Sequence, residues 1–212
     1  MCVSKKLKAI QNSMPKTVTL VAVSKTKPKT AIMEAYQSGQ RVFGENKVQE
    51  LVEKAALLPE DINWHMIGHL QRNKVKLIAP FVSLIHGVDS LKLLKEIDKR
   101  AAQNKRVINC LLQVHIAKES TKFGFGINEI TQVIKDAKQF ENIRITGLMG
   151  MATFTDNDEQ ISIEFKSLKD IFDKVRNQDI SILSIGMSGD YQIAIEQGST
   201  MVRIGSAIFG AR

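Results

Sequence analysis

The stretch VTLVAVSKTKP, residues 18–28, decides the fold prediction. It begins as an apolar, β-branched run, which favours a buried strand, and it ends in Ser24 and Lys25. Pro28 then favours the first turn of a helix, which we expect to run to about Gln37 and to stop at Gly39. The same unit, a short apolar strand followed by an amphipathic helix, recurs along the chain. Apolar strands of this kind are typical of a parallel sheet covered by helices.

Eight such strands are predicted, and most are followed by a helix. They cover residues 18–25, 41–46, 62–68, 82–89, 106–116, 143–150, 180–188 and 200–206. Dividing 212 residues by eight gives about 26 per unit, which suits a (β/α)8 or TIM barrel. We therefore predict one α/β barrel domain over residues 1–212. An open doubly wound sheet competes with it, but the dinucleotide-binding version needs GxGxxG where this chain has SKTKPK.

Capping residues predict where several helices begin. A lead-in helix is expected at about residues 4–13, before the first strand. Ser90 is expected to cap a helix that runs through Gln103, and Asn128 a helix that runs to about Lys138. A long helix is expected over about residues 159–175.

Composition excludes several classes of protein. Residues 1–15 contain no long apolar stretch, so we expect no signal peptide. No run approaches the roughly 20 apolar residues of a membrane span. The two cysteines, Cys2 and Cys110, have no metal-ligand spacing. Two lone thiols in a chain of this size indicate a reducing compartment. Cys110 is expected to be a core residue. The net charge of +8 is dispersed and is not interleaved with aromatics. We therefore expect a cytoplasmic protein that binds neither nucleic acid nor a membrane.

The candidate site lies at the strand ends, because parallel barrels carry their active sites at the carboxyl end of the strands. Lys25 ends a buried strand, where an ammonium group is costly unless it is paired or used. It is either a solvated strand-end lysine or an amine ready to form a Schiff base with an aldehyde. Arg203, in MVRIG, either forms a salt bridge at the rim of the barrel or donates a hydrogen bond to a pyridine nitrogen. A guanidinium only donates, so it would leave that nitrogen unprotonated.

Two small-residue loops predict a phosphate site. GMSGD, residues 186–190, and RIGS, residues 203–206, follow the seventh and eighth strands, where barrels of this type often bind phosphate. Ser188 and Ser206 offer hydroxyl donors, and Gly189 and Gly205 let the backbone approach a ligand closely. Ordinary turn chemistry is the alternative explanation.

The four histidines do not predict a metal site. His65 and His69 have the i, i+4 spacing of a helical ligand pair, but they straddle a strand end and Gly68. We expect satisfied polar residues near the barrel mouth instead. GMSGD also departs from the nucleophile pattern GxSxG, so no serine hydrolase site is predicted.

Four motifs together resemble one known family. AVSKTKP at 22–28, FGENKVQE at 43–50, WHMIGHLQRNK at 64–74 and GSTMVRIGSAIFGAR at 198–212 are similar to the YggS/PROSC family of pyridoxal phosphate homeostasis proteins. The similarity spans the whole chain in the same order. It implies a barrel like the N-terminal domain of alanine racemase, with pyridoxal 5'-phosphate (PLP) as cofactor.

The resemblance also implies a role for each site residue. Lys25 matches the lysine that carries PLP, and Arg203 matches the arginine at the ring nitrogen. Asn46 matches an asparagine beside the ring. The phosphate loops match Met187, Ser188, Gly189, Gly205 and Ser206. Family members are implied to bind and deliver PLP, with PLP-dependent apo-enzymes as candidate partners and with no established reaction.

The chain departs from the family pattern at three positions. His69 stands where proline is usual, His115 where asparagine is frequent, and Gly189 falls at a variable position of GMSxD. The residues that would anchor the cofactor are intact, so the departures concern contacts with the ring or with partners.

The leading hypothesis is a non-catalytic, monomeric carrier of PLP. The alternative is a PLP-dependent amino-acid racemase, which needs an acid or base on each face of the cofactor. Neither Tyr36 nor Tyr191 is an evident second base. A basic interaction module and a barrel isomerase acting on a phosphorylated sugar are the remaining hypotheses.

Overall fold

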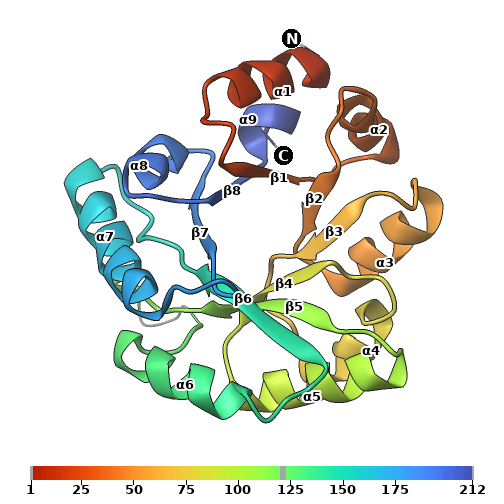
Figure 1. Cartoon of the computed structure of the whole chain (residues 1–212). Coiled ribbons are helices and arrows are strands. Elements are labelled where there is room, and N and C mark those ends of the chain that lie inside the picture. Colours follow the sequence, from red (N-terminus) through yellow and green to blue (C-terminus); the bar gives the residue numbers. More distant parts are fainter. Residues whose placement is uncertain (1, 120–122, 212) are drawn as a thin grey trace.

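Eight parallel strands follow one another in chain order around a closed barrel, as predicted (Figure 1). The computed structural model describes residues 2–119 and 123–211. The strands are β1 (Thr19–Val23), β2 (Val42–Glu45), β3 (Asn63–Met66), β4 (Leu84–Val88), β5 (Ile108–Gln113), β6 (Ile143–Met149), β7 (Ile182–Met187) and β8 (Met201–Ile204). β8 closes the barrel by pairing with β1, with Val21 opposite Arg203.

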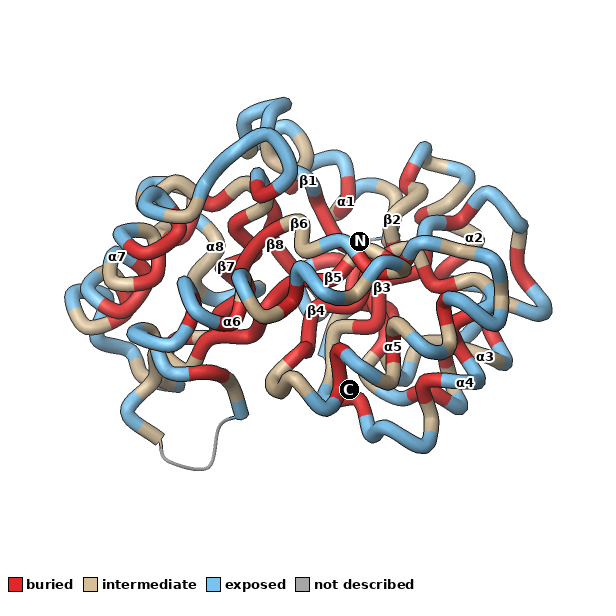
Figure 2. Tube along the Cα trace, turned by 60° about the horizontal axis from the view of Figure 1, so that its bottom comes forward, coloured by how far each residue is buried: buried red, intermediate tan, exposed pale blue. Residues whose placement is uncertain are grey.

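Helices surround the barrel and cover the outer face of the strands (Figure 1). They are α1 (Val3–Asn12), α2 (Lys29–Gln37), α3 (Val48–Leu57), α4 (Val75–Ile78), α5 (Leu91–Gln103), α6 (Ile130–Ala137), α7 (Asp158–Val175), α8 (Tyr191–Glu196) and α9 (Ser206–Phe209). Two 3-10 turns, η1 (Arg72–Lys74) and η2 (Ile127–Glu129), precede α4 and α6. Buried positions follow the strands and one side of each long helix (Figure 2).

Most of the predicted helix ends are confirmed. The Ser90 hydroxyl accepts a hydrogen bond from the backbone N–H of Leu93 and caps α5. Pro28 precedes α2, and Gly39 follows that helix with a φ of 97°. The prediction that Asn128 caps a helix is wrong, because Asn128 lies inside η2. There the Glu129 carboxylate accepts from the backbone N–H of Gly126, so a side chain from within the turn takes the place of the cap.

The inside of the barrel is filled in layers. Val21, Leu84, Leu111, Met149 and Met201 form an apolar cluster that is separate from the larger core between strands and helices. Side chains two residues apart on a strand share a face. The next inward-facing positions on two of these strands are therefore polar: His86 follows Leu84, and Arg203 follows Met201. The barrel interior thus changes from apolar to polar towards the carboxyl ends of the strands.

Cys110 is fully buried in β5, as predicted, and burial raises the pKa of its thiol. Cys2 is exposed, and both cysteines are free. No helix in residues 2–119 and 123–211 combines the length and the apolar character needed to cross a membrane.

Candidate functional site

One cavity of about 630 Å³ opens among the loops that follow the strands. It brings together every residue that the sequence marked as cofactor-binding. These are Lys25, Asn46, Met187, Ser188, Gly189, Arg203, Gly205 and Ser206. They come from the ends of β1, β2, β7 and β8, so the convergence of strand ends brings together residues up to 181 positions apart (206 − 25).

The backbone on both sides of Lys25 is held by a buried network. Lys54 donates to the carbonyl of Ser24 at 2.8 Å, to Glu45 at 2.8 Å and to Glu50 at 2.7 Å. The Ser24 hydroxyl donates to Glu45 at 2.6 Å. We call Ser24, Glu45, Glu50 and Lys54 the lysine cluster. It fixes the residue that precedes Lys25 through both the backbone and the side chain.

The lysine cluster also holds the residue that follows Lys25. Thr26 has a φ of 64°, a left-handed conformation that is unfavourable for a β-branched residue. Its backbone N–H donates to Glu50 at 2.6 Å, which compensates for part of that strain. Lys25 therefore projects from a turn that is fixed on both sides, and it is half-buried at the cavity wall.

Arg203 is a buried cation without a carboxylate partner among the described residues. Its Nη1 donates to the carbonyl and the hydroxyl of Ser184, both at 2.7 Å, and its Nη2 donates to the carbonyl of Gly150 at 3.0 Å. Burial lowers its pKa to about 10, and nearby Asp190 raises it. The guanidinium has five N–H donors. Two of them thus have no acceptor within residues 2–119 and 123–211 and are available to a ligand in the cavity.

The two predicted phosphate loops are joined to each other. The Ser188 hydroxyl accepts from the backbone N–H of Gly205 at 3.1 Å. The Asp190 carboxylate accepts from the N–H of Met187 at 2.5 Å and closes the first loop on itself. A Cβ added to Gly189 would meet nothing within 4 Å, so the space beside this residue is open. The Ser188 hydroxyl keeps its own proton to donate to an anion.

Sequence reasoning missed part of the cavity wall. Lys27, Gln113, Phe123 and Phe154 also line it. Gln113 ends β5, so the strand-end rule could have found it. Phe123 and Phe154 lie in loops whose course a strand pattern does not predict. Lys27 donates to the carbonyls of Gly210 and Ala211, which joins the turn after β1 to the end of the described chain.

Glycine lets two of the strand-end turns approach closely. A Cβ on Gly68 would lie 2.5 Å from the carbonyl oxygen of Asn46. Any other residue at this position would push the turn after β3 away from Asn46. The close approach therefore helps to place Asn46 at the cavity wall.

The histidines separate into two groups. His65 and His86 are buried, and His86 Nε2 lies 3.0 Å from His65 Nδ1. His69 is exposed, its Nδ1 lies 3.0 Å from Asp89, and its ring stacks on Phe123. His69 lines the cavity and His115 does not, so only the first of these departures reaches the site. In residues 2–119 and 123–211, no three histidines, cysteines or acids are grouped as metal ligands.

Comparison with known proteins shows the family to which this chain belongs. The sequence model of the alanine racemase N-terminal domain family matches residues 3–212. The pyridoxal phosphate homeostasis protein of Haemophilus influenzae is 40% identical over 209 residues, which cover 95% of this chain and 88% of that protein. The Escherichia coli protein of the same name is 39% identical over 209 residues, covering 93% and 87% of the two chains. The chain belongs to the pyridoxal phosphate homeostasis protein family.

Solved structures show how members of this family and their distant relatives compare in shape. PipY of Synechococcus elongatus, solved with PLP bound, has 33% identity and a TM-score of 0.90 over 98% of this chain and all of that one. Its structure without PLP has a TM-score of 0.93. An alanine racemase from Clostridium difficile has a TM-score of 0.79 at 15% identity, and the match covers 99% of this chain but 56% of the racemase. That likeness shows a shared fold.

Proposed function

We propose that this protein binds PLP covalently through Lys25 and serves PLP homeostasis as a carrier and buffer of the cofactor. The observation that carries the proposal is the single cavity that gathers an amine, a buried guanidinium with spare donors and two hydroxyl-bearing loops. Family membership supports it, because relatives about 40% identical are named as PLP homeostasis proteins and PipY is known with PLP bound.

Each group in the cavity has chemistry that suits one part of PLP. The bound cofactor would supply an aldehyde, which condenses with an amine. Lys25 is the amine we assign to it. Arg203 would donate to the ring nitrogen, and Asn46 would lie beside the ring. Met187, Ser188, Gly189, Gly205 and Ser206 would surround the phosphate, with the Ser188 hydroxyl as a donor.

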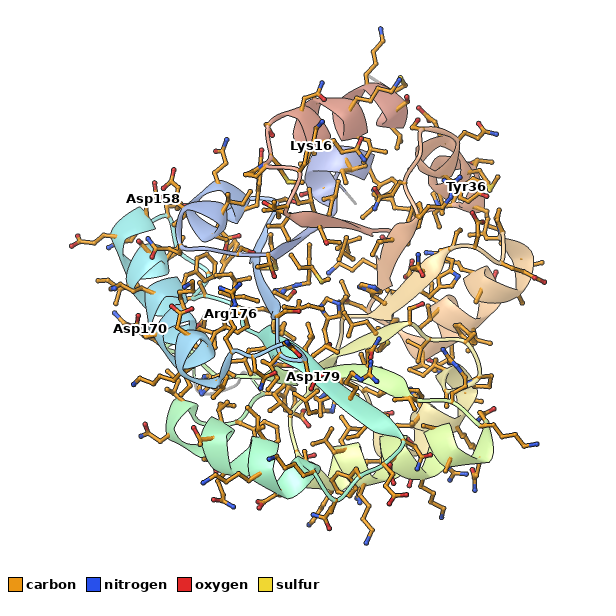
Figure 3. The ribbon with its side chains drawn as sticks, viewed as in Figure 1. Lys16, Tyr36, Asp158, Asp170, Arg176 and Asp179 are labelled. Carbon is orange, nitrogen blue, oxygen red and sulfur yellow. The ribbon has the colours of Figure 1, made fainter. Side chains whose placement is uncertain are left out.

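A racemase role has little support from the arrangement of the two tyrosines. Tyr36 lies on the outside of α2 and donates to Asp61 at 2.8 Å (Figure 3). The Tyr191 hydroxyl lies 3.3 Å from Ser13. Neither lines the cavity, so neither is placed to act as the second base. We therefore infer a binding protein without catalysis of its own. Racemisation of a common amino acid, followed by chiral chromatography, would contradict this inference.

The remaining parts of the proposal concern setting and partners. We infer one PLP-binding domain over residues 1–212, acting in the cytoplasm as a monomer. PLP-dependent apo-enzymes are the proposed recipients. The dispersed positive charge favours neither nucleic acid nor a membrane as a partner.

The test is a titration of the protein with PLP, followed by visible absorbance and by retention after dialysis. Wild type should develop an absorbance band that survives dialysis, and Lys25→Ala should lose it while keeping its fold. The control is Lys29→Ala, which removes an exposed lysine 3.7 Å from Glu53 and away from the cavity. Equal retention by Lys25→Ala and wild type would refute the assignment.

A further inference from the structure

A chain of hydrogen bonds crosses the inside of the barrel behind the cavity. Arg203 donates to the Ser184 hydroxyl at 2.7 Å, which lies 3.3 Å from His86 Nδ1, and His86 Nε2 lies 3.0 Å from His65 Nδ1. We call these four residues the arginine chain. β4 and β7 are not neighbours in the sheet, so the contact between His86 and Ser184 spans the barrel interior.

The chemistry of arginine fixes the direction of the first bond in this chain. A guanidinium has no acceptor, so the Ser184 oxygen accepts from Arg203. In the arrangement in which each member donates to the next, the Ser184 proton points to an unprotonated His86 Nδ1. Neutral His86 then carries its proton on Nε2 and donates it to His65 Nδ1. In either tautomer of His86, turning the Arg203 Nη1 elsewhere would take this donor from the Ser184 hydroxyl and carbonyl.

Burial keeps the two histidines in the neutral state that this direction requires. Burial lowers the pKa of His65 to about 3. It also lowers the pKa of His86 well below the usual value, and the charges of His65 and Arg203 lower it further. The fully buried Ser184 adds its carbonyl as a second acceptor for Nη1. Ser184 thus presents two buried acceptors to the Arg203 guanidinium, and neutral His86 lies beside the Ser184 hydroxyl.

We propose that Ser184, His86 and His65 are positioning residues that hold the Arg203 guanidinium with its spare N–H groups towards the cavity, and so keep the ring nitrogen of bound PLP as an unprotonated acceptor. The inference rests on the proposed function and deepens it. None of the three lines the cavity, so each acts on the cofactor through Arg203. The role differs from that of Lys25, which would contact the cofactor directly.

The test variant is Ser184→Ala, which removes the link in the middle of the chain and keeps the backbone carbonyl. The matched control is Ser199→Ala. Ser199 is also buried and donates to the carbonyl of Ile185 at 2.8 Å, but it does not contact Arg203. His86→Gln is the second variant, in case Ser184→Ala folds poorly. Two measurements are made: the Nε–H exchange rate of Arg203 by NMR without ligand, and the absorbance of the PLP-loaded protein against pH.

The proposal predicts that Ser184→Ala and His86→Gln speed Nε–H exchange of Arg203, shift the pH midpoint of the PLP absorbance and weaken PLP binding by about threefold to tenfold. Ser199→Ala should match wild type in all three. Unchanged exchange and unchanged absorbance in both test variants would overturn the positioning role and leave PLP binding intact. Altered exchange in a protein that never binds PLP would instead overturn the proposed function and keep the structural role of the chain.

Discussion

Two buried cations lie close to the turns and strand ends that form the cavity, Arg203 in its wall and Lys54 behind it, and their surroundings differ in kind. Lys54, in the lysine cluster, has two carboxylates within 2.8 Å. Arg203, in the arginine chain, has only neutral acceptors among the described residues. Burying a charge is costly unless it is paired. The paired lysine is therefore best explained by structure, because it holds the turn around Lys25. The arginine without a carboxylate partner is explained by the proposed function, in which its remaining donors would bind a ligand.

Methionine in place of each buried cation tests the two roles, and the largest effect on stability is expected for Lys54→Met. Loss of Lys54 leaves Glu45 buried without its cation, and one oxygen of that carboxylate already has no partner among the described residues. Removing one partner of a buried ion pair costs about 3–5 kcal/mol. We expect a loss of this size in the free energy of unfolding, measured with urea in the absence of PLP. Adding Glu45→Gln should restore part of it, and a loss below about 1 kcal/mol would contradict the account.

Arg203→Met should have the smaller effect on stability and the larger one on ligand binding. No described carboxylate is stranded by this change, and the neutral acceptors lose hydrogen bonds worth about 1–3 kcal/mol in total. PLP affinity should nevertheless fall by at least about tenfold, since the donors for the ring nitrogen disappear. The same urea and PLP titrations measure both quantities. A variant that loses more stability than Lys54→Met and keeps its PLP affinity would reverse the assigned roles.

The contributions of the lysine cluster and the arginine chain to stability should also change with pH in opposite directions. The buried His65 and His86 have folded-state pKa values below 6.5, so the unfolded chain binds more protons once the pH falls below that value. Their contribution to stability is complete above pH 6.5 and is lost on acidification, by up to about 1.4 kcal/mol per pH unit for each histidine. The pKa of Glu45 is raised, because the effect of burial outweighs the lowering by Lys54 and Ser24. The folded chain therefore binds this proton more readily than the unfolded chain, and protonation of Glu45 favours the fold as the pH falls.

Urea unfolding at about pH 7 and pH 5.5 measures the histidine contribution, because unfolded histidines titrate in that window and carboxylates with ordinary pKa values titrate below it. Wild type should lose stability across it, and His86→Gln should lose less because one proton-binding group is gone. An equal loss in both proteins would mean that the arginine chain is not held by neutral histidines.

The sequence predicted the fold and the cavity wall better than what lies behind the wall. Strands, helices and strand-end residues such as Lys25 and Arg203 follow local patterns and one rule about parallel barrels. The arginine chain depends on a contact between His86 and Ser184, which are 98 positions apart. Ser184 lies in ILSIGM, a segment whose pattern predicts only an apolar strand. Asn128 failed as a cap because Glu129, one residue later, supplied the local acceptor. Long-range polar pairing between strands leaves no periodic signal in a single sequence.

Covalent binding of PLP at Lys25 is tested by borohydride reduction of the PLP-loaded protein, followed by mass spectrometry of its peptides. We expect one reduced pyridoxyl group, on Lys25 in the segment AVSKTKP. A modified residue elsewhere, or a protein that takes up no PLP and gains no mass, would contradict it.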